Sequence, residues 1–508
     1  MTNAHRRRKS DVLHVAIDLG AGSGRAFVGG AGPTGLRLTE VHRFHYAPRR
    51  IDGHLRWDIG ALTEGVRASL QRARAAAEGL RAPIASLGVD SWAVDYALLD
   101  AEGRLLEDPI CYRDERTADA IAEVLAVLPP EQIYARTGIQ FQQFNTLYQL
   151  WAHVRDGLSD RATHLLLMPD FCHHLLCGSL VSERTNASTT QLLDARSGRW
   201  DDQLFDRLHL PRHLMPDIVA TGTVLGTLRP ELGGERDVTP VSVVAPGTHD
   251  TASAVAGTPL APGWAFISSG TWSLVGVERD EPLLSEAAAR ANLTNESGVF
   301  GSVHLLANVM GLWLLESCRR EWEAEGRGQD LPSLLRAVAR VPESAGVVFP
   351  DDPRFFTPSS MASALRLALT ESGQADTNDP VLLTKLVLDS LALRYGSVVD
   401  RIEQLTGRAI EGLHVVGGGS QNDYLNQATA NASGRPVLAG PVEATATGNV
   451  LVQAITTGEL ASLEEGRRLL GGPLTLRRFE PRDRGRWVEA SNRYRDLEAQ
   501  HSPYGERT

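Results

Sequence analysis

This chain opens with a strand that ends in a glycine-rich turn and is followed at once by a second strand. Residues 12–17 are apolar enough for a buried strand, Gly20, Gly22 and Gly24 punctuate the turn, and residues 25–29 resume a strand-like pattern. Because a strand and not a helix follows the glycines, the segment is not a dinucleotide-binding fingerprint. The pattern therefore predicts a β-hairpin at the start of the fold.

The same pattern returns in the second half of the chain, after a Gly/Pro-rich break at residues 257–263. Residues 264–268 and 274–277 are the strand-like runs, and Gly270 and Thr271 lie in the small-residue turn between them. Glycine turns between strands are common, so coincidence and domain duplication both stay open on pattern alone. Duplication predicts two similar halves with a cleft between them.

The length of 508 residues and the hydrophobic share of 42% fit two domains. Helical periodicity at residues 62–79 and strand-like runs at 84–89 and 96–99 alternate along the first half. In the second half a helix is expected at 381–404, and the charged tail suggests a surface helix at 487–500. This alternation indicates the α/β class. The predicted parts are an N-terminal domain (12–256), a C-terminal domain (257–480) and terminal extensions (1–11 and 481–508).

Charge and cysteine usage exclude several kinds of partner. The net charge of −11 gives no general attraction to nucleic acid or to an anionic membrane. No apolar run approaches the roughly 20 residues of a membrane helix, and the basic stretch at 5–9 is interpreted as a charged tail, not a signal peptide. The cysteines follow no metal-ligand spacing and favour a reduced compartment: Cys111, Cys172, Cys177 and Cys318. We expect a cytoplasmic protein, monomeric or weakly homo-oligomeric.

Both predicted hairpin turns have the small residues that let a phosphate approach the backbone. Glycine leaves N–H groups accessible, and a carboxylate at a strand end, such as Asp18, can hold a hydrated Mg²⁺. In the second turn the Thr271 hydroxyl offers a donor. An ordinary β-turn explains either segment taken alone.

A third glycine segment, VVGGGSQN at residues 415–422, follows a predicted strand at 413–416. Its three glycines precede polar residues at an expected helix start. Such a segment suits an adenine or a ribose-phosphate packed against the glycine backbone near a helix N-terminus.

The segment PGTHDTASA, residues 246–254, places His249 and Asp250 between a predicted strand and a small-residue helix. Most acids at such a junction only cap the helix. The alternative is a general base, because phosphoryl transfer to an alcohol requires the hydroxyl to be oriented and its proton accepted. Asp250 is the candidate for that base.

Two further segments have both a functional and a structural interpretation. In GVDSWAVD, residues 88–95, a tryptophan flanked by Asp90 and Asp95 suits a sugar site, but a core tryptophan with solvated acids explains the pattern equally well. The stripe of helical spacing over residues 308–316, within a helix expected at 310–322, is interpreted mostly as core.

Taken together and in this order, these segments resemble the FGGY family of carbohydrate kinases, from about Val12 to about Glu459. Further matching stretches resemble in particular the members that phosphorylate L-rhamnulose: YRDERT, GIQFQQFNTLYQL, SSGTWSL, NLTNESG and GPVEATATGN. The resemblance implies two actin-like ATPase (ribonuclease H-like) domains with a catalytic cleft between them. It also implies ATP and Mg²⁺ as cofactors, and phosphorylation of the hydroxyl on the first carbon of L-rhamnulose.

The resemblance also implies roles by position. The implied nucleotide-facing residues are Ala21, Gly22, Ser23, Gly24, Arg25, Thr271, Glu316 and Gly418. The implied sugar-contacting residues are Ala93, His249, Asp250, Thr251 and Asn308. Asp250 is also the implied proton acceptor, and Asp18 the implied Mg²⁺ residue.

The chain departs from the family pattern at two of these positions. Ala93 stands where the pattern has a glycine, and its methyl group narrows the sugar pocket. Glu316 stands where a glutamine is expected near the nucleotide, and an acid there repels phosphate unless it points away or is paired. The alternatives are a kinase for another ketose (fuculose, xylulose or ribulose) and a non-catalytic sugar or nucleotide sensor.

Overall fold

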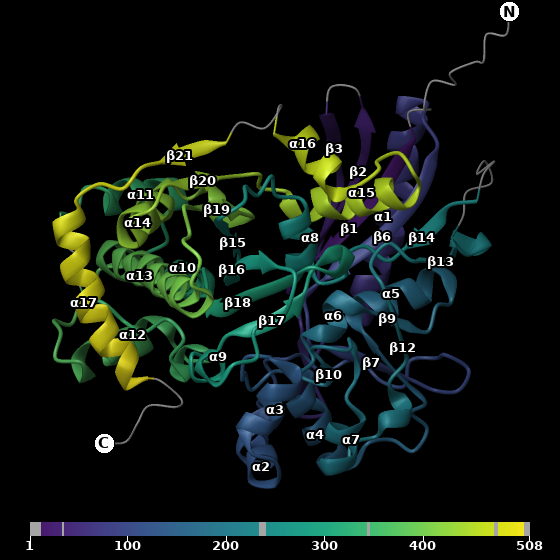
Figure 1. Ribbon diagram of the computed structural model, residues 1–508, viewed down its shortest axis with the longest axis horizontal. Helices are drawn as coiled ribbons and strands as arrows, with labels where there is room; N and C mark the ends of the chain where they lie inside the picture. Colours follow the sequence, from purple (N-terminus) through teal and green to yellow (C-terminus); the bar gives the residue numbers. More distant parts are fainter. Residues whose placement is uncertain (1–11, 33–34, 233–239, 343–345, 472–475, 502–508) are drawn as a thin grey trace, which may run out of the picture.

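The computed structural model describes residues 12–32, 35–232, 240–342, 346–471 and 476–501. The expected basic tail at 5–9 lies outside the described residues. Two helix-flanked β-sheets form the two halves, the first to the right and the second to the left in Figure 1. Among the helices of these ranges, none is long and apolar enough to cross a membrane.

The first sheet has six strands in the order β13-β14-β6-β1-β2-β3. The strands are β1 (Leu13–Leu19), β2 (Ser23–Gly32), β3 (Gly35–His45), β6 (Ile84–Ser91), β13 (Val224–Thr227) and β14 (Ser242–Val244). β1 pairs antiparallel with β2 and parallel with β6, so it lies in the middle of the sheet, where its apolar residues are buried.

The second sheet has seven strands in the order β17-β18-β16-β15-β19-β20-β21. The strands are β15 (Trp264–Ser269), β16 (Trp272–Arg279), β17 (Thr294–Ser297), β18 (Val303–Met310), β19 (Gly412–Val416), β20 (Val437–Ala439) and β21 (Arg477–Phe479). β15 pairs antiparallel with β16 and parallel with β19. The order β18-β16-β15-β19-β20 therefore repeats β3-β2-β1-β6-β14, and the predicted two-domain α/β architecture is confirmed.

An α-helical elaboration interrupts the first half and has a core of its own, around Tyr148, Leu150 and Phe205. Its helices are α2 (Ala120–Val127), α3 (Pro130–Thr137), α4 (Thr146–Gly157), α6 (Arg184–Ser188) and α7 (Asp202–Arg207). Helix α5 (Met168–Cys177) instead packs on β6 of the first sheet and belongs to the main core. The small strands of this half are β4 (Arg49–Ile51), β5 (His54–Arg56), β7 (Tyr96–Leu99), β8 (His164–Leu167), β9 (Val181–Glu183), β10 (Leu193–Asp194), β11 (Arg199–Trp200) and β12 (Asp217–Val219).

Capping residues set the bounds of the long helices. The helix predicted at 62–79 is α1 (Ile59–Leu80), whose N-cap Asp58 accepts the Ala61 amide. The helix predicted at 381–404 is α13 (Pro380–Thr406), with Asp379 as N-cap and a left-handed Gly407 as C-cap. The remaining helices are α8 (Asp250–Ala256), α9 (Glu286–Arg290), α10 (Trp313–Ala324), α11 (Leu331–Val338), α12 (Met361–Glu371), α14 (Asp423–Ser433), α15 (Ala444–Thr456), α16 (Leu463–Leu470) and α17 (Arg484–Gln500).

One helix prediction needs correction, and the structure adds detail to a second. The helix expected at 310–322 starts only at Trp313, because Met310 is still paired with Trp272 in the sheet. The expected surface helix at 487–500 is part of α17, but it is docked on the second half and not simply exposed. Its Tyr494 is 1% exposed and its Glu498 forms an ion pair with Arg394 of α13.

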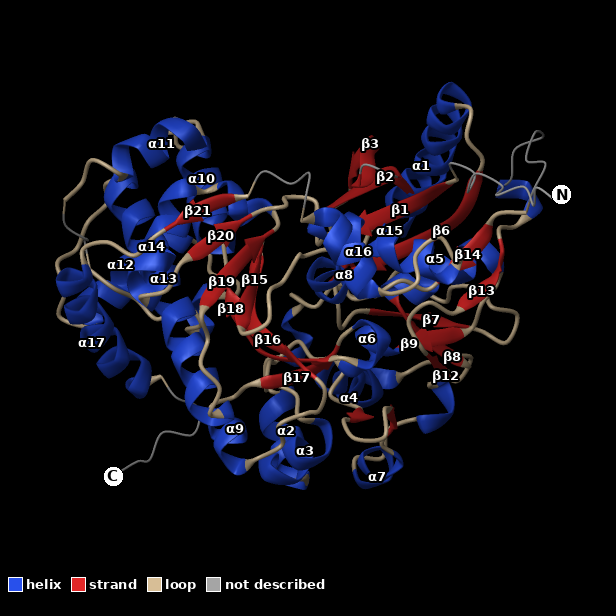
Figure 2. Ribbon diagram, turned by 45° about the horizontal axis from the view of Figure 1, so that its top comes forward, coloured by secondary structure: helices blue, strands red, loops and turns tan. Residues whose placement is uncertain are grey.

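The halves are joined by an exchanged helix. In the chain α15 lies between β20 and β21 of the second sheet, but it packs on the first sheet (Figure 2). There Gln453 Nε2 donates to the Val15 carbonyl at 2.9 Å. α15 also crosses α8 so closely that a Cβ on Gly448 would lie 1.8 Å from the Ser253 carbonyl oxygen. Glycine at this crossing therefore sets the distance between the two halves.

Candidate active site

A cavity of about 270 Å³ lies between the two halves and is lined by both hairpin turns. The first half contributes the β1–β2 turn, the segment after β6 and the start of α8. The second half contributes the β15–β16 turn, β17, β18 and the glycine segment after β19. The duplicated pattern in the sequence thus converges on one cleft.

Asp18 at the end of β1 is the charged centre of the first hairpin. It is 6% exposed, and its Oδ2 accepts Arg25 Nη2 at 2.5 Å. Arg25 also forms an ion pair with Glu443, just before α15. The hydroxyl of Tyr46 donates to the Gly20 carbonyl at 2.5 Å and holds the turn. The guanidinium thus neutralises the carboxylate that was predicted to hold Mg²⁺.

The five residues predicted to face the ATP phosphates separate into two groups. Ala21 and Arg25 line the cavity, whereas Gly22, Ser23 and Gly24 do not. Gly22 has a φ of +150° and turns the chain, and a Cβ on Gly24 would lie 2.2 Å from the Phe44 ring. Gly24 therefore has a packing requirement independent of any ligand.

Thr271 and Gly418 are the corresponding residues of the second half. Thr271 is exposed at the β15–β16 turn and lines the cavity. Gly418 follows β19, and a Cβ there would meet no atom within 4 Å, so its backbone faces open space. Gly418 also lines a wider cavity of about 860 Å³, so it borders both this cavity and the 270 Å³ cavity.

The wider cavity has an apolar wall suited to a flat ring, including Leu312, Leu315 and Leu335. Glu316 lines this cavity and not the 270 Å³ one. Its carboxylate is bound to Arg319 at 2.7 and 2.9 Å, and its side chain is 48% exposed. The acid that departs from the family pattern is thus paired.

Asp250 begins α8 and faces the cavity with Thr251 and His249 beside it. Burial and the charge of Asp18 raise the pKa of Asp250 to about 7, while the Thr251 hydroxyl, 3.2 Å from Oδ1, opposes the rise. Burial and His304 lower the pKa of His249 to about 3, so its imidazole is uncharged at neutral pH. A carboxylate with a pKa near neutrality is suited to accept a proton from an alcohol.

A buried acid that the sequence did not single out fixes the loop before Asp250. Glu183 is 0% exposed and accepts the amide and hydroxyl of Thr248 at 3.1 and 2.8 Å. It also accepts the hydroxyls of Thr185 and Thr221, and Thr185 Oγ1 in turn accepts the His249 amide at 3.1 Å. No local pattern marks Glu183, because Thr221 and Thr248, which link it to the loop before Asp250, lie far along the chain.

The acids around Trp92 differ from both interpretations of that motif. Trp92 lines the cavity with Ala93, as a sugar site requires. Asp95 is 1% exposed and accepts the indole N–H groups of Trp57 and Trp92 at 2.6 and 3.0 Å. Asp90 is 0% exposed on β6. Neither acid is solvated and neither lines the cavity. Asp95 holds the aromatic wall, whereas Asp90 accepts the side-chain amide of Asn449 on α15.

Asn308 on β18 lines the cavity and is held by a residue of the first half. Its amide N–H donates to Gln140 Oε1 at 2.8 Å, and its side-chain Nδ2 is 3.3 Å from both Gln140 Oε1 and Glu296 Oε1. Gln140 and Glu296 also line the cavity. They lie in stretches that carried the family resemblance, GIQFQQF and NLTNESG, but no role was predicted for them.

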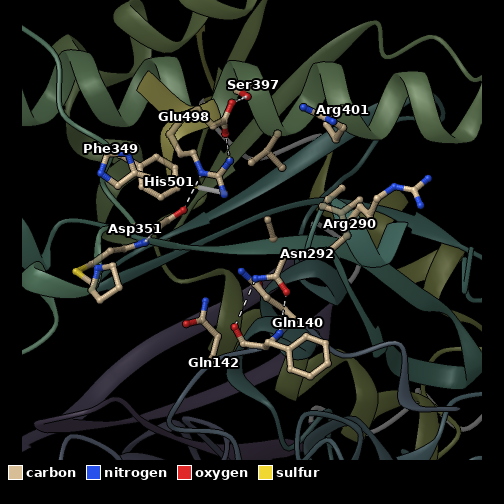
Figure 3. Close-up of a pocket in the computed structure, with 18 of the residues that line it drawn as sticks. Gln140, Gln142, Arg290, Asn292, Phe349, Asp351, Ser397, Arg401, Glu498 and His501 are labelled. Carbon is tan, nitrogen blue, oxygen red and sulfur yellow. Dashed lines mark hydrogen bonds and ion pairs between the residues drawn. The ribbon is translucent and has the colours of Figure 1, made fainter. Parts of the chain in front are cut away.

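The loop that carries Gln140 also lines a neighbouring cavity of about 430 Å³, which is drawn in Figure 3. Gln140, Phe144 and Trp272 line both cavities. Asn292 holds the loop from the second half, with Oδ1 accepting the Phe141 amide at 2.9 Å. The position of Gln140 therefore depends on both halves.

Comparisons with known proteins agree with this architecture. Residues 13–257 match the N-terminal domain, and residues 265–457 the C-terminal domain, of the FGGY family of carbohydrate kinases. The rhamnulokinase of Pectobacterium carotovorum subsp. carotovorum is 44% identical, covering 92% of this chain and 93% of its own. That of Bacteroides thetaiotaomicron is 39% identical, over 94% and 97%. The solved ligand-bound xylulose kinase of Lactobacillus acidophilus shares the fold, with a TM-score of 0.77 at 15% identity over 98% of this chain and all of that one.

Proposed function

The chain belongs to the FGGY family of carbohydrate kinases, and from this premise we propose that it phosphorylates L-rhamnulose. The reaction transfers the γ-phosphoryl group of ATP to the hydroxyl on the first carbon of the ketose and releases ADP. Relatives about 40% identical over more than nine tenths of the chain carry the name rhamnulokinase, which supports this substrate over other ketoses.

The observation that carries the chemistry is Asp250, a carboxylate with a pKa of about 7 that faces the cavity between the two hairpin turns. We assign it as the base that accepts the proton of the attacking hydroxyl. His249, uncharged because burial lowers its pKa, and Thr251 lie beside it with polar atoms available to orient the sugar. Proton acceptance by a positioned side chain contributes about 10²- to 10⁴-fold to rate.

The second half has the features that a nucleotide requires. The exposed Thr271 hydroxyl and the open backbone of Gly418 fit phosphate and ribose, and the wide cavity beyond Gly418 has the apolar wall that adenine needs. Closure of the two halves would exclude water, which otherwise competes for the phosphoryl group.

Mg²⁺ is the second cofactor that we propose, with Asp18 as its protein residue. Mg²⁺ usually takes one or two carboxylates together with substrate phosphates, and Asp18 lies on the cavity wall with Asp250. The ion supplies charge neutralisation for the phosphates. Arg25 must give up its contact with Asp18, and Glu443 offers it an alternative partner.

The test is ADP release from MgATP with L-rhamnulose, beside L-fuculose, L-ribulose and D-xylulose. We expect the highest kcat/KM with L-rhamnulose, and a loss of turnover of about 10²-fold or more in Asp250→Ala with ADP affinity retained. A preference for another ketose would overturn the proposed substrate. Near-normal turnover of Asp250→Ala would remove it as the base.

We further propose a cytoplasmic location, because the reaction uses ATP and the four cysteines are free thiols. The monomeric or weakly oligomeric state expected from the sequence stays a prediction. Sedimentation of the purified protein, together with fractionation of the cells that express it, would test both.

A further inference from the structure

Glu296 is a carboxylate that the second half places against the catalytic end of the first. It lies on β17, its side chain is 4% exposed, and it lines the cavity. Its Oε2 is 3.3 Å from Nδ1 of His249, the residue that precedes Asp250. One side chain of the second half thus approaches the neighbour of the predicted proton acceptor.

The two oxygens of Glu296 are in different situations. Oε1 accepts the side-chain amide of Asn308 at 3.3 Å. Oε2 is buried and has no hydrogen-bond partner among the residues that the structure describes, since the approach of His249 lacks hydrogen-bond geometry. Buried carboxylate oxygens are normally satisfied, and one that is not, on the wall of a ligand cavity, is satisfied by the ligand.

The groups around Oε2 indicate what kind of ligand atom fits. Oε2 lies against His249, whose Nε2 is 3.5 Å from Asp250 Oδ1, whereas Asn308 donates to the other oxygen, Oε1. Burial raises the pKa of Glu296 to about 7; the Asp250 charge adds to the rise, while Asn308 and Thr294 oppose it. A neutral hydroxyl fits both forms of this carboxyl group, because it can donate to the ionised carboxylate and accept from the protonated carboxyl.

Resting on the proposed function, we propose that Glu296 binds the sugar, with Oε2 accepting a hydrogen bond from a hydroxyl of the ketose. It is then a specificity-determining residue supplied by the second half, whereas Asp250 and His249 come from the first. A site built to bond a hydroxyl strongly rejects the analogue that lacks it, because the buried acceptor is left unpaired. Sugar recognition and approach of the two halves are thereby linked through one side chain.

The test is a double-mutant-style cycle that combines substitutions of Glu296 with removal of single hydroxyl groups from the sugar. Wild type, Glu296→Gln and Glu296→Ala are assayed with the best ketose substrate and with its series of monodeoxy analogues. Glu286→Gln, an exposed acid of α9, is the matched control. We expect kcat/KM for the parent sugar to fall about 10- to 100-fold in Glu296→Ala, mainly through KM for sugar, while KM for ATP and the melting temperature change little.

The decisive result is coupling. For one deoxy analogue, the loss seen in wild type should be absent in Glu296→Ala, because the variant has already lost the acceptor for that hydroxyl. If, for every analogue, the loss in kcat/KM from the deoxy sugar and the loss from Glu296→Ala simply multiply, the proposal is overturned. Glu296 would then act only by holding Asn308 in place. The cycle uses whichever ketose wild type phosphorylates best, so a wrong substrate assignment and a wrong role for Glu296 fail separately. No turnover and no sugar binding in wild type would overturn both.

Discussion

The two halves repeat one strand order but place different side chains at equivalent positions. In the first, Asp18 is paired across the ladders with Arg25 on β2 and with Asp90 on β6. Asp90 is fully buried, and burial together with the charge of Asp18 raises its pKa well above the usual range. The end of the first hairpin is therefore a cluster of ionisable groups, with the Asp18–Arg25 ion pair at its centre.

The second half has neutral residues at the same register. Ser268 is paired with Leu274 on β16 and with Val416 on β19. The polyanionic nucleotide is proposed to lie against this uncharged side, while the base and the metal residue lie opposite. The difference teaches that the repeated topology fixes where ligands meet, whereas the side chains at one register decide which half performs proton and metal chemistry.

Substituting the equivalent residues breaks the comparison most directly. We expect Asp18→Asn to lower kcat by about 100- to 1000-fold, because the charge proposed to hold Mg²⁺ is lost. The matched change Ser268→Ala should stay within about threefold, since no charge is removed. ADP release measured over a Mg²⁺ titration checks both, and equal effects in the two halves would contradict the asymmetry.

The proposed base of the charged half should titrate near neutrality. A base must be deprotonated to act, so a pKa of about 7 for Asp250 predicts that kcat/KM for the sugar falls about tenfold per pH unit below 7 and levels off above it. Part of the rise comes from the charge of Asp18. In the residual activity of Asp18→Asn the acid limb should therefore move to lower pH, and an unmoved limb would assign it to another group.

The fold was largely predictable because its signals are local. Alternating strand and helix patterns gave both hairpins, and Pro380 and Gly407 delimit α13 close to the predicted helix. The packing of α15 on the first sheet depends on tertiary contacts such as Gln453 with Val15, which no window of sequence contains. The docking of α17 was missed for the same reason.

The site was predictable only where a motif keeps its residues together. His249, Asp250 and Thr251 are consecutive, and the structure brings them to one cavity with Asn308. Glu183, Gln140 and Glu296 act through partners distant in sequence, so a single chain gives no spacing signal for them. Gly24 shows the opposite case, a motif residue without a place in the cavity. Glycine is needed there because a larger residue would collide with Phe44.

Substitutions at two neighbouring glycines test the proposed nucleotide site of the neutral half, and we expect effects of intermediate size. Gly418→Val adds a side chain to open space, so the protein should fold normally while KM for ATP rises about tenfold. Gly419→Ala would place a Cβ 2.0 Å from Ser269 Oγ and should lower the free energy of unfolding by about 1–3 kcal/mol. Thermal unfolding with ATP kinetics separates them. A Gly418→Val enzyme with unchanged KM for ATP would move the nucleotide elsewhere.

The smallest effect concerns the only acid among the nucleotide-facing positions predicted for the second half. Glu316 is 48% exposed and paired with Arg319, so its charge is largely compensated and screened by solvent. We expect Glu316→Gln, which introduces the family's usual residue, to lower KM for ATP by at most about twofold and to leave kcat unchanged. Arg319→Gln should raise KM for ATP, because it frees the carboxylate, and both changes should fade at high salt. A tenfold change in KM for ATP in Glu316→Gln that persists at high salt would show that Glu316 contacts the nucleotide directly. The second half would then place a charge in its nucleotide site, against the contrast between the two halves.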